Sequence, residues 1–147
     1  LVKYSSKAVE LFPDDKELLT FKKFAIIGQQ QINEASMIAS KGLNFFNQKL
    51  FVEAGVEFEK ALKIDSLEYS HFENAASSFY MAGDYGKALN YSEKVIENFN
   101  PKTGKSEYIN ALVHISIGGT ELGCELLEQS IKYGYVQAKT TFEQRCN

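Results

Sequence analysis

The stretch Ile38-Ala39-Ser40-Lys41-Gly42-Leu43-Asn44-Phe45-Phe46 decides the fold, because its pattern returns as Phe72-Glu73-Asn74-Ala75-Ala76-Ser77-Ser78-Phe79-Tyr80. At this offset of 34 residues, small residues fall on small residues and aromatic residues on aromatic residues. The same offset also pairs Phe51 with Tyr85, Ala54 with Ala88, and Glu59-Lys60 with Glu93-Lys94. Self-similarity at a fixed spacing is typical of repeat proteins, so the sequence predicts a chain of structural repeats.

A third unit follows at an offset of 35 residues and matches less closely. Ala76 falls on Ala111, Ala88 on Gly123, and Ile96 on Ile131. The additional residue fits the loop of residues 98–105, where Pro101 and Gly104 would stop a helix and allow a longer turn.

Each unit has the pattern of a helical hairpin. Apolar residues recur at steps of three and four, which is the stripe of an amphipathic helix. Gly83 can take the left-handed conformation that ends a helix, and Asp84 can cap the next one. Only two prolines occur in the chain, which also favours an all-α fold. The sequence predicts helices over 35–48, 51–64, 69–82, 85–98, 105–118, 121–132 and 136–145.

These residues resemble the tetratricopeptide repeat (TPR), whose hairpins combine small and large apolar residues at set positions. The first unit resembles it through Ile38, Gly42, Phe45, Ala54, Phe58 and Ala61, and the second through Phe72, Ala76, Phe79, Gly83, Tyr85, Ala88 and Val95. The third keeps Ala111, Leu127 and Ile131. The second unit departs from the pattern at Ser92, where an aromatic residue is expected. The resemblance implies a right-handed α-solenoid.

We therefore expect repeats over 35–68, 69–102 and 103–134, preceded by N-terminal helices in 1–34 and closed by a capping helix in 135–147. The last repeat resembles that of many bacterial TPR proteins, through Cys124 to Gly134 followed by Ala138 and Cys146. The N-terminal register is open. Either one extra helix lies at about Lys16 to Gln30, or a repeat has been shortened. A helix that begins at Ile32 could also continue to residue 48 and serve both repeats. The chain begins with Leu1, so we expect a fragment of a longer protein.

Composition excludes several classes of protein. The 147 residues are 44% apolar and 13% aromatic, which suits one packed domain and excludes disorder. The formal net charge of -3 leaves no positive surplus for a phosphate backbone, so general nucleic-acid binding is not expected. The longest apolar run, Phe24 to Ile27, is far below the roughly 20 residues of a membrane span. The compartment is not indicated: the cytoplasm and a bacterial envelope are both compatible.

No motif predicts catalysis, a cofactor or a metal. The two histidines, His71 and His114, have no metal-ligand spacing around them. The acidic pairs Asp14-Asp15 and Glu57/Glu59 are interpreted as solvated or helix-capping carboxylates. Cys124 and Cys146 are interpreted as two partly buried free thiols, with a single disulfide as the alternative.

The TPR resemblance places a binding groove on the first helix of each hairpin. The groove residues carried over to this chain are mostly uncharged, and the partner-binding candidates among them are Leu43, Phe46, Asn47, Asn74, Ser77, Tyr80, Met81, Lys105, Tyr108 and Leu112. The competing interpretation is that their aromatic and aliphatic members pack between repeats. Some TPR domains bind the C-terminal carboxylate of chaperones through five basic and amide residues. Only Asn74 and Lys105 match that set here, so this role is not expected.

The sequence therefore predicts a non-catalytic scaffold that binds a peptide or helix of another protein in a largely uncharged concave groove. An uncharged groove predicts binding that salt weakens little. Two alternatives remain open. The chain could be a self-association module, in which the N-terminal helices dock onto a second copy to form a homodimer, or a regulatory domain of a larger enzyme or envelope protein.

Overall fold

The computed structural model describes residues 16–147, which form eight helices and no strand. Their bounds are α2 Lys16–Ile26, α3 Gln29–Asn47, α4 Phe51–Ile64, α5 Tyr69–Ala82, α6 Tyr85–Asn98, α7 Lys105–Ser116, α8 Thr120–Lys132 and α9 Val136–Arg145. The bounds predicted for α4, α5, α6 and α9 are confirmed to the residue. No helix among the described residues is long and apolar enough to cross a membrane.

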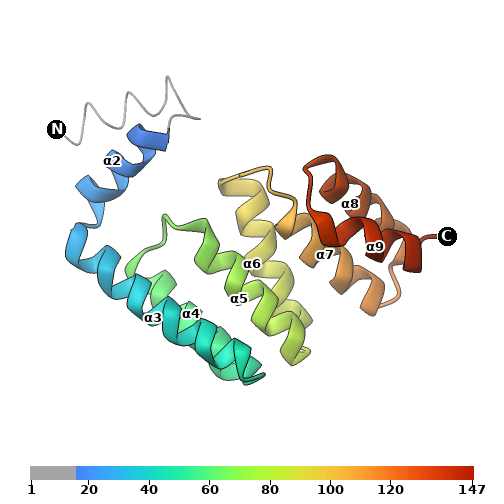
Figure 1. The fold of residues 1–147 in the computed structure, drawn as a ribbon, viewed down its shortest axis with the longest axis horizontal. Coiled ribbons are helices and arrows are strands. Elements are labelled where there is room, and N and C mark those ends of the chain that lie inside the picture. Colours follow the sequence, from blue (N-terminus) through green and yellow to red (C-terminus); the bar gives the residue numbers. More distant parts are fainter. Residues whose placement is uncertain (1–15) are drawn as a thin grey trace.

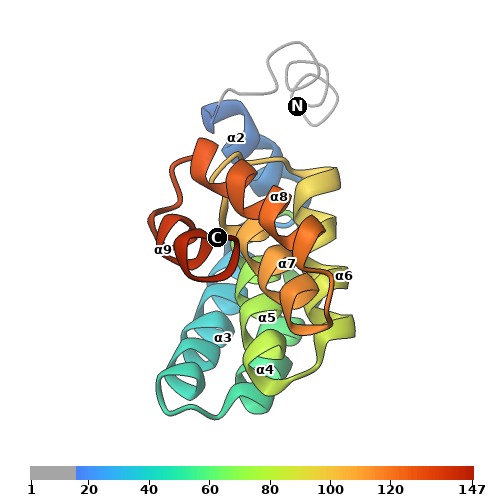
Figure 2. The same ribbon diagram turned by 90° about the vertical axis from the view of Figure 1, so that its right-hand side faces the viewer.

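The helices pack in chain order, each against the next from α3 to α9, and α5 also contacts α7. Figure 1 shows this as three hairpins, α3–α4, α5–α6 and α7–α8, that follow one another along the molecule. Viewed from the end in Figure 2, α9 lies beside α8 at the C-terminal end of the stack. The predicted all-α solenoid of helical hairpins is confirmed.

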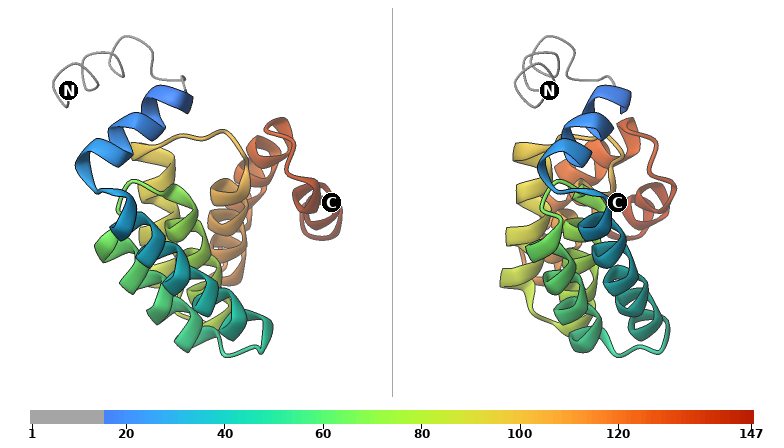
Figure 3. Two further views of the ribbon diagram at one scale, coloured as in Figure 1. Left: turned by 60° about the vertical axis from the view of Figure 1, so that its left-hand side comes forward. Right: turned by 90° about the vertical axis from the view of Figure 1, so that its left-hand side faces the viewer.

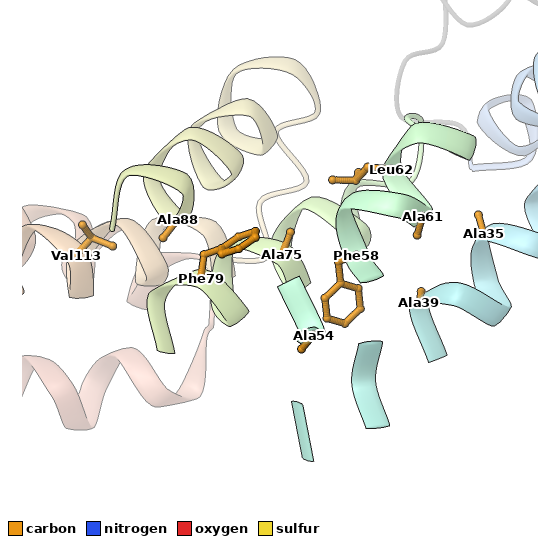
Figure 4. Packing of buried hydrophobic residues seen from close by; sticks show 10 residues of the cluster. All are labelled: Ala35, Ala39, Ala54, Phe58, Ala61, Leu62, Ala75, Phe79, Ala88 and Val113. Atoms are coloured by element: carbon orange, nitrogen blue, oxygen red, sulfur yellow. The ribbon is translucent and has the colours of Figure 1, made fainter. Parts of the chain in front are cut away.

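The core runs along the stack as a line of small and large side chains between consecutive helices (Figure 4). Ala54, Ala61, Ala75 and Ala88 are fully buried, and they let the helix axes approach closely. Phe58 is also fully buried and fills the space beside them. A second cluster, centred on Ala111, Leu127 and Ala138, joins α7, α8 and α9.

The turns follow the expected chemistry. Gly83 has φ 82° at the end of α5, in the left-handed conformation that glycine adopts without a Cβ clash. The Asp84 carboxylate then accepts a hydrogen bond from the Lys87 backbone N–H at 3.1 Å and caps α6. Gly104 has φ 79° directly before α7, as the longer loop after α6 requires.

The N-terminal region differs from the predicted helix over 35–48. α3 begins six residues earlier, at Gln29, and Gly28 with φ 89° separates it from α2. The extra helix expected between Lys16 and Gln30 is present, but it ends at Ile26. The single long helix considered for 32–48 is present as α3, but it starts three residues before Ile32 and ends at Asn47.

α2 leads away from the hairpins, as the two views of Figure 3 show. It has no buried residue. Its Lys23 ammonium forms ion pairs with Asp65 at 2.7 Å and Glu68 at 2.8 Å, in the loop between α4 and α5. Leu19, Phe21, Phe24 and Ile26 are exposed.

The expectation of two free thiols is wrong. Cys124 of α8 and Cys146 after α9 form a disulfide, with their Cα atoms 5.8 Å apart. The chain between them, residues 125–145, turns back on itself through α9, which brings the two side chains together. The disulfide therefore fastens the capping helix to the last hairpin.

The interpretation of Glu57 and Glu59 as solvated or capping is also wrong. Glu57 is buried, and its carboxylate lies 2.6 Å from the Lys60 ammonium. Glu59 accepts hydrogen bonds from Lys87 at 3.0 Å and from the Tyr91 hydroxyl at 2.6 Å. Both carboxylates are thus part of side-chain networks. Asp14 and Asp15 lie outside the described residues.

Candidate functional site

The first helices of the three hairpins contribute to one hollow, which encloses about 200 Å³. We call it the α3–α5–α7 hollow. It is lined by Leu43, Phe46, Phe58, Asn74, Ser77 and Lys105. This volume lies below the roughly 300–1,000 Å³ of small-molecule clefts, so it suits one or two protein side chains.

Apolar side chains form one part of the α3–α5–α7 hollow. Leu43 on α3 is 46% exposed and offers the most accessible apolar surface there. The Phe46 ring is half-buried and packs edge-on against Phe51, with ring centroids 5.2 Å apart. Phe58 reaches the hollow from α4, although it is fully buried.

Polar side chains from α5 and α7 form the other part. The Lys105 ammonium donates to Asn74 Oδ1 at 3.0 Å, and this hydrogen bond ties α7 to α5. Ser77 donates its hydroxyl hydrogen to the Glu73 backbone carbonyl at 2.9 Å. Since the Asn74 oxygen is occupied by Lys105, the Asn74 amide N–H groups are what this residue can offer to a partner.

The charge of Lys105 is largely held within the protein. Burial lowers the pKa of Lys105, and the nearby Glu73 carboxylate acts against that shift. Glu73 itself is buried rather than lining the groove, and it accepts hydrogen bonds from Ser106 at 3.1 Å and Thr103 at 3.4 Å. Burial raises the pKa of Glu73. The hollow therefore presents little net charge to a partner.

The structure brings five of the ten candidate residues together, namely Leu43, Phe46, Asn74, Ser77 and Lys105. Asn47 and Met81 are exposed at the ends of α3 and α5. Tyr80 is half-buried against Tyr85, with ring centroids 5.8 Å apart. The remaining two candidates lie on α7, where Leu112 is half-buried.

Tyr108 is engaged by the capping helix region. Its ring centroid lies 5.1 Å from that of Tyr135, and its hydroxyl is 3.1 Å from Thr141 Oγ1 on α9. We therefore regard Tyr108 as a support for α9 rather than a free groove residue.

One lining residue was missed from the candidates. Phe58 was identified only as a repeat residue, because a core aromatic on a second helix gives no sign that its edge reaches a surface hollow. In the structure the Phe58 ring lies so close to Gly42 that a Cβ placed on Gly42 would be 3.0 Å from it. The missing side chain at Gly42 lets Phe58 extend toward α3.

Nothing in the hollow forms a catalytic arrangement of nucleophile, base and orienting acid. Within residues 16–147, no group of three His, Cys, Asp or Glu side chains is placed to bind a metal ion. His71 is buried away from the hollow's lining and its Nδ1 has no hydrogen-bond partner. Burial lowers the pKa of His71, which keeps the imidazole neutral.

Comparison with known proteins shows which known fold this chain resembles. No family model and no curated protein matches the chain. Among solved structures, the chain is similar to the Sgt2 TPR domain from Aspergillus fumigatus, with a TM-score of 0.68 and 21% identity over 76% of each chain. The chain thus has the fold of a TPR domain. Its bacterial origin stays a prediction.

Proposed function

We propose that this chain is a non-catalytic scaffold that binds a segment of another protein in the α3–α5–α7 hollow. The observation that carries the proposal is the lining itself. Exposed Leu43 and the Phe46 ring lie opposite the Asn74 amide, so apolar contact and backbone hydrogen bonding are available together. A short helix or extended peptide with one or two apolar side chains fits this arrangement.

A displayed peptide library, selected on the intact chain, tests the proposal. The enriched peptide is then titrated against the wild type, Leu43→Glu and Met37→Glu. Both substituted side chains are exposed on α3, at 46% and 75%, but only Leu43 lines the hollow. We expect Leu43→Glu to weaken binding by about tenfold, or about 1.4 kcal/mol, and Met37→Glu to leave it unchanged. Equal losses in the two variants would contradict the proposal.

Salt dependence gives a second test of the same complex. Because Lys105 is engaged with Asn74 and Glu73 lies nearby, the hollow offers no free charge for long-range attraction. The dissociation constant should change by less than about threefold between about 0.1 M and about 1 M salt. A steep loss of affinity would show that charged residues elsewhere hold the peptide.

Self-association is a second candidate function, and α2 is the observation that favours it. This helix buries none of its residues, and four large apolar side chains on it are exposed. A second copy could cover them. Sedimentation equilibrium of the wild type and of a Phe21→Ser/Phe24→Ser variant tests this: a dimer that the substitutions abolish would support it, and a monomer at all concentrations would exclude it.

A further inference from the structure

A second hollow lies between α4 and α6 and shares no lining residue with the α3–α5–α7 hollow. We call it the α4–α6 hollow. It encloses about 340 Å³ and is lined by Glu59, Leu62, Lys63, Phe72, Tyr91 and Lys94. It is larger and more open to solvent than the α3–α5–α7 hollow, which suits a side chain of a docked segment rather than a buried small molecule.

The hollow has an aromatic and aliphatic floor. The Phe72 and Tyr91 rings lie with their centroids 6.3 Å apart, and both are half-buried. Leu62 adds an aliphatic surface that is 9% exposed. These side chains are held in place, because Phe72 also packs on Phe99 and Tyr91 on Phe79. The floor can therefore receive an apolar side chain without rearrangement.

The one carboxylate of the lining is already satisfied. Glu59 accepts hydrogen bonds from the Tyr91 hydroxyl at 2.6 Å and from Lys87 at 3.0 Å. Burial and this hydrogen bond raise the pKa of Tyr91, so the phenol stays neutral and continues to donate. Glu59 is thus compensated by groups beside it.

The two lysines of the lining are not compensated in this way. Lys63 and Lys94 are exposed, and no carboxylate oxygen of the described residues lies within 4.0 Å of either ammonium. The Lys94 ammonium lies 5.7 Å from the Tyr91 ring centroid, directly beside the apolar floor. An anionic group next to a bound apolar side chain would therefore meet positive charge.

The next pair of hairpins provides an internal comparison. The repeat offset of 34 carries Lys63 to Glu97, and the offset of 35 carries Lys94 to Gln129. The equivalent place between α6 and α8 therefore lacks both lysines. The positive charge at the α4–α6 hollow is a local feature and is not imposed by the repeat.

From this charge complementarity we propose that the α4–α6 hollow is a second docking site, for a segment of another protein in which an aromatic side chain is flanked by carboxylates. The aromatic side chain lies on Phe72, Leu62 and Tyr91, and the carboxylates face Lys63 and Lys94. The chain would then hold two different partner segments at once, one in each hollow.

The test uses the intact chain and two blocked probes, acetyl-Glu-Phe-Glu-amide and its neutral counterpart acetyl-Gln-Phe-Gln-amide, in an NMR titration. We expect the acidic probe to shift the signals of Leu62, Lys63 and Phe72, and the neutral probe to bind at least about fivefold more weakly. A Lys63→Gln/Lys94→Gln variant should lose about fivefold in affinity for the acidic probe, which is the size expected for two exposed charge pairs.

A matched control separates a site from general attraction. Lys132→Gln/Lys139→Gln removes the same net charge from exposed lysines of α8 and α9 and should leave binding unchanged. Equal weakening in both double variants, equal binding of the two probes, or shifts confined to the α3–α5–α7 hollow would overturn the proposal. So would a lysine-dependent dimer without probe, which would assign the surface to a second copy. Leu43→Glu should not affect this titration. The proposal for the α4–α6 hollow and the proposal for the α3–α5–α7 hollow are therefore tested separately.

Discussion

Gly55 sets how closely α4 approaches α5. A Cβ at this position would lie 2.7 Å from the Phe79 ring, which is itself buried between the two helices. Gly55→Ala should therefore destabilise the fold by about 1–3 kcal/mol, because the ring has no free space to move into. Urea unfolding followed by circular dichroism measures this change.

Gly86 supplies the matched control for Gly55. It also lies within a helix, α6, but a Cβ there would meet only Asp84 Oδ1 at 3.7 Å. Gly86→Ala should leave the free energy of unfolding unchanged or raise it by up to about 0.5 kcal/mol, since Gly86 lies in the first turn of α6, where alanine has free space and a smaller advantage than in a helix interior. If both substitutions stabilised the chain, close helix approach at Gly55 would be excluded.

Ser92 stands where the TPR pattern has an aromatic residue, and the structure gives the reason. Its hydroxyl is fully buried and lies within hydrogen-bond distance of Asn110 Oδ1 across the α6–α7 contact, and also of the Ala88 backbone carbonyl at 2.8 Å within α6. Ser92→Ala leaves the buried Asn110 oxygen without this partner, which should cost about 1–3 kcal/mol. A double-mutant cycle with Asn110→Ala should give a coupling energy above about 0.5 kcal/mol. Strict additivity would mean that the two side chains do not interact.

The burial and the partners of individual side chains were the hardest features to predict. The repeat pattern identified Gly42 and Phe58 as a small and a large repeat residue, because pattern residues recur, but it did not indicate that they lie against each other. It could not indicate that Glu57 is buried, since its partners Lys41 and Lys60 are contributed by two helices. Charge networks between helices depend on the angle at which the helices pack. The apolar periodicity of a single helix does not predict that angle.

At the scale of elements, α2 is attached by charge. Burial lowers the pKa of Lys23, but hydrogen bonds to Asp65 and Glu68 outweigh it and raise the pKa above its ordinary 10.5. Burial likewise raises the pKa of Glu68, but the Lys23 and Ser70 hydrogen bonds outweigh it and lower the pKa below 4.5. The contribution of Glu68 is therefore complete above pH 4.5 and is lost as the pH falls through its lowered pKa. The contribution of Lys23 is complete below pH 10.5 and is lost as the pH rises through its raised pKa.

We expect the attachment of α2 to weaken as the pH falls through the lowered pKa of Glu68, because one of the two ion pairs of Lys23 is then lost. The protonated Glu68 no longer attracts Lys23, so the part of the stabilisation that Glu68 contributes above pH 4.5 is lost on acidification, while the Lys23–Asp65 ion pair stays outside this step. Amide chemical shifts of α2, followed by NMR from about pH 6 to about pH 3, measure this change. In Lys23→Met the α2 signals should already be shifted at pH 6 and show no such transition. Identical titrations of wild type and variant would rule out the attachment.

α9 is held by a covalent bond as well as by packing. The Cys124–Cys146 disulfide closes a segment with a sequence separation of 22 residues, for which chain entropy predicts a stabilisation of about 3 kcal/mol. Reduction should lower the free energy of unfolding by about this amount. Cys124→Ser/Cys146→Ser should be equally destabilised and insensitive to reductant. An unchanged unfolding curve after reduction would contradict this role of the bond.

Elements were predicted best where turn chemistry and periodicity agree. Gly83 and Asp84 fixed the boundary of α5 and α6 to the residue. The start of α3 was placed too late, because Gln29 to Glu34 is polar and lacks an apolar stripe. The sequence alone could not predict a disulfide in preference to two free thiols, since the two cysteines come together only through the turn before α9.

At the scale of the whole molecule, serial stacking is what creates both hollows. Each hairpin buries its small residues only against its neighbours, and the curvature of the row leaves surface between alternate helices. The repeat offset predicted a chain of structural repeats, and the TPR resemblance implied that they stack as a solenoid. The position of a hollow was not predictable in full, because Tyr108 had to be seen against α9 before it could be excluded from the α3–α5–α7 hollow.

Methyl and aromatic NOEs in the intact chain test this stacking most directly. Serial stacking predicts contacts of Leu127 with Ala111 and Ala138, and a separate set joining Phe58 to Ala54 and Phe79. It predicts none between Leu127 and Phe58. NOEs linking α8 or α9 to α3 or α4 would show a closed globule instead of a row of hairpins, and both proposed binding surfaces would lose their basis.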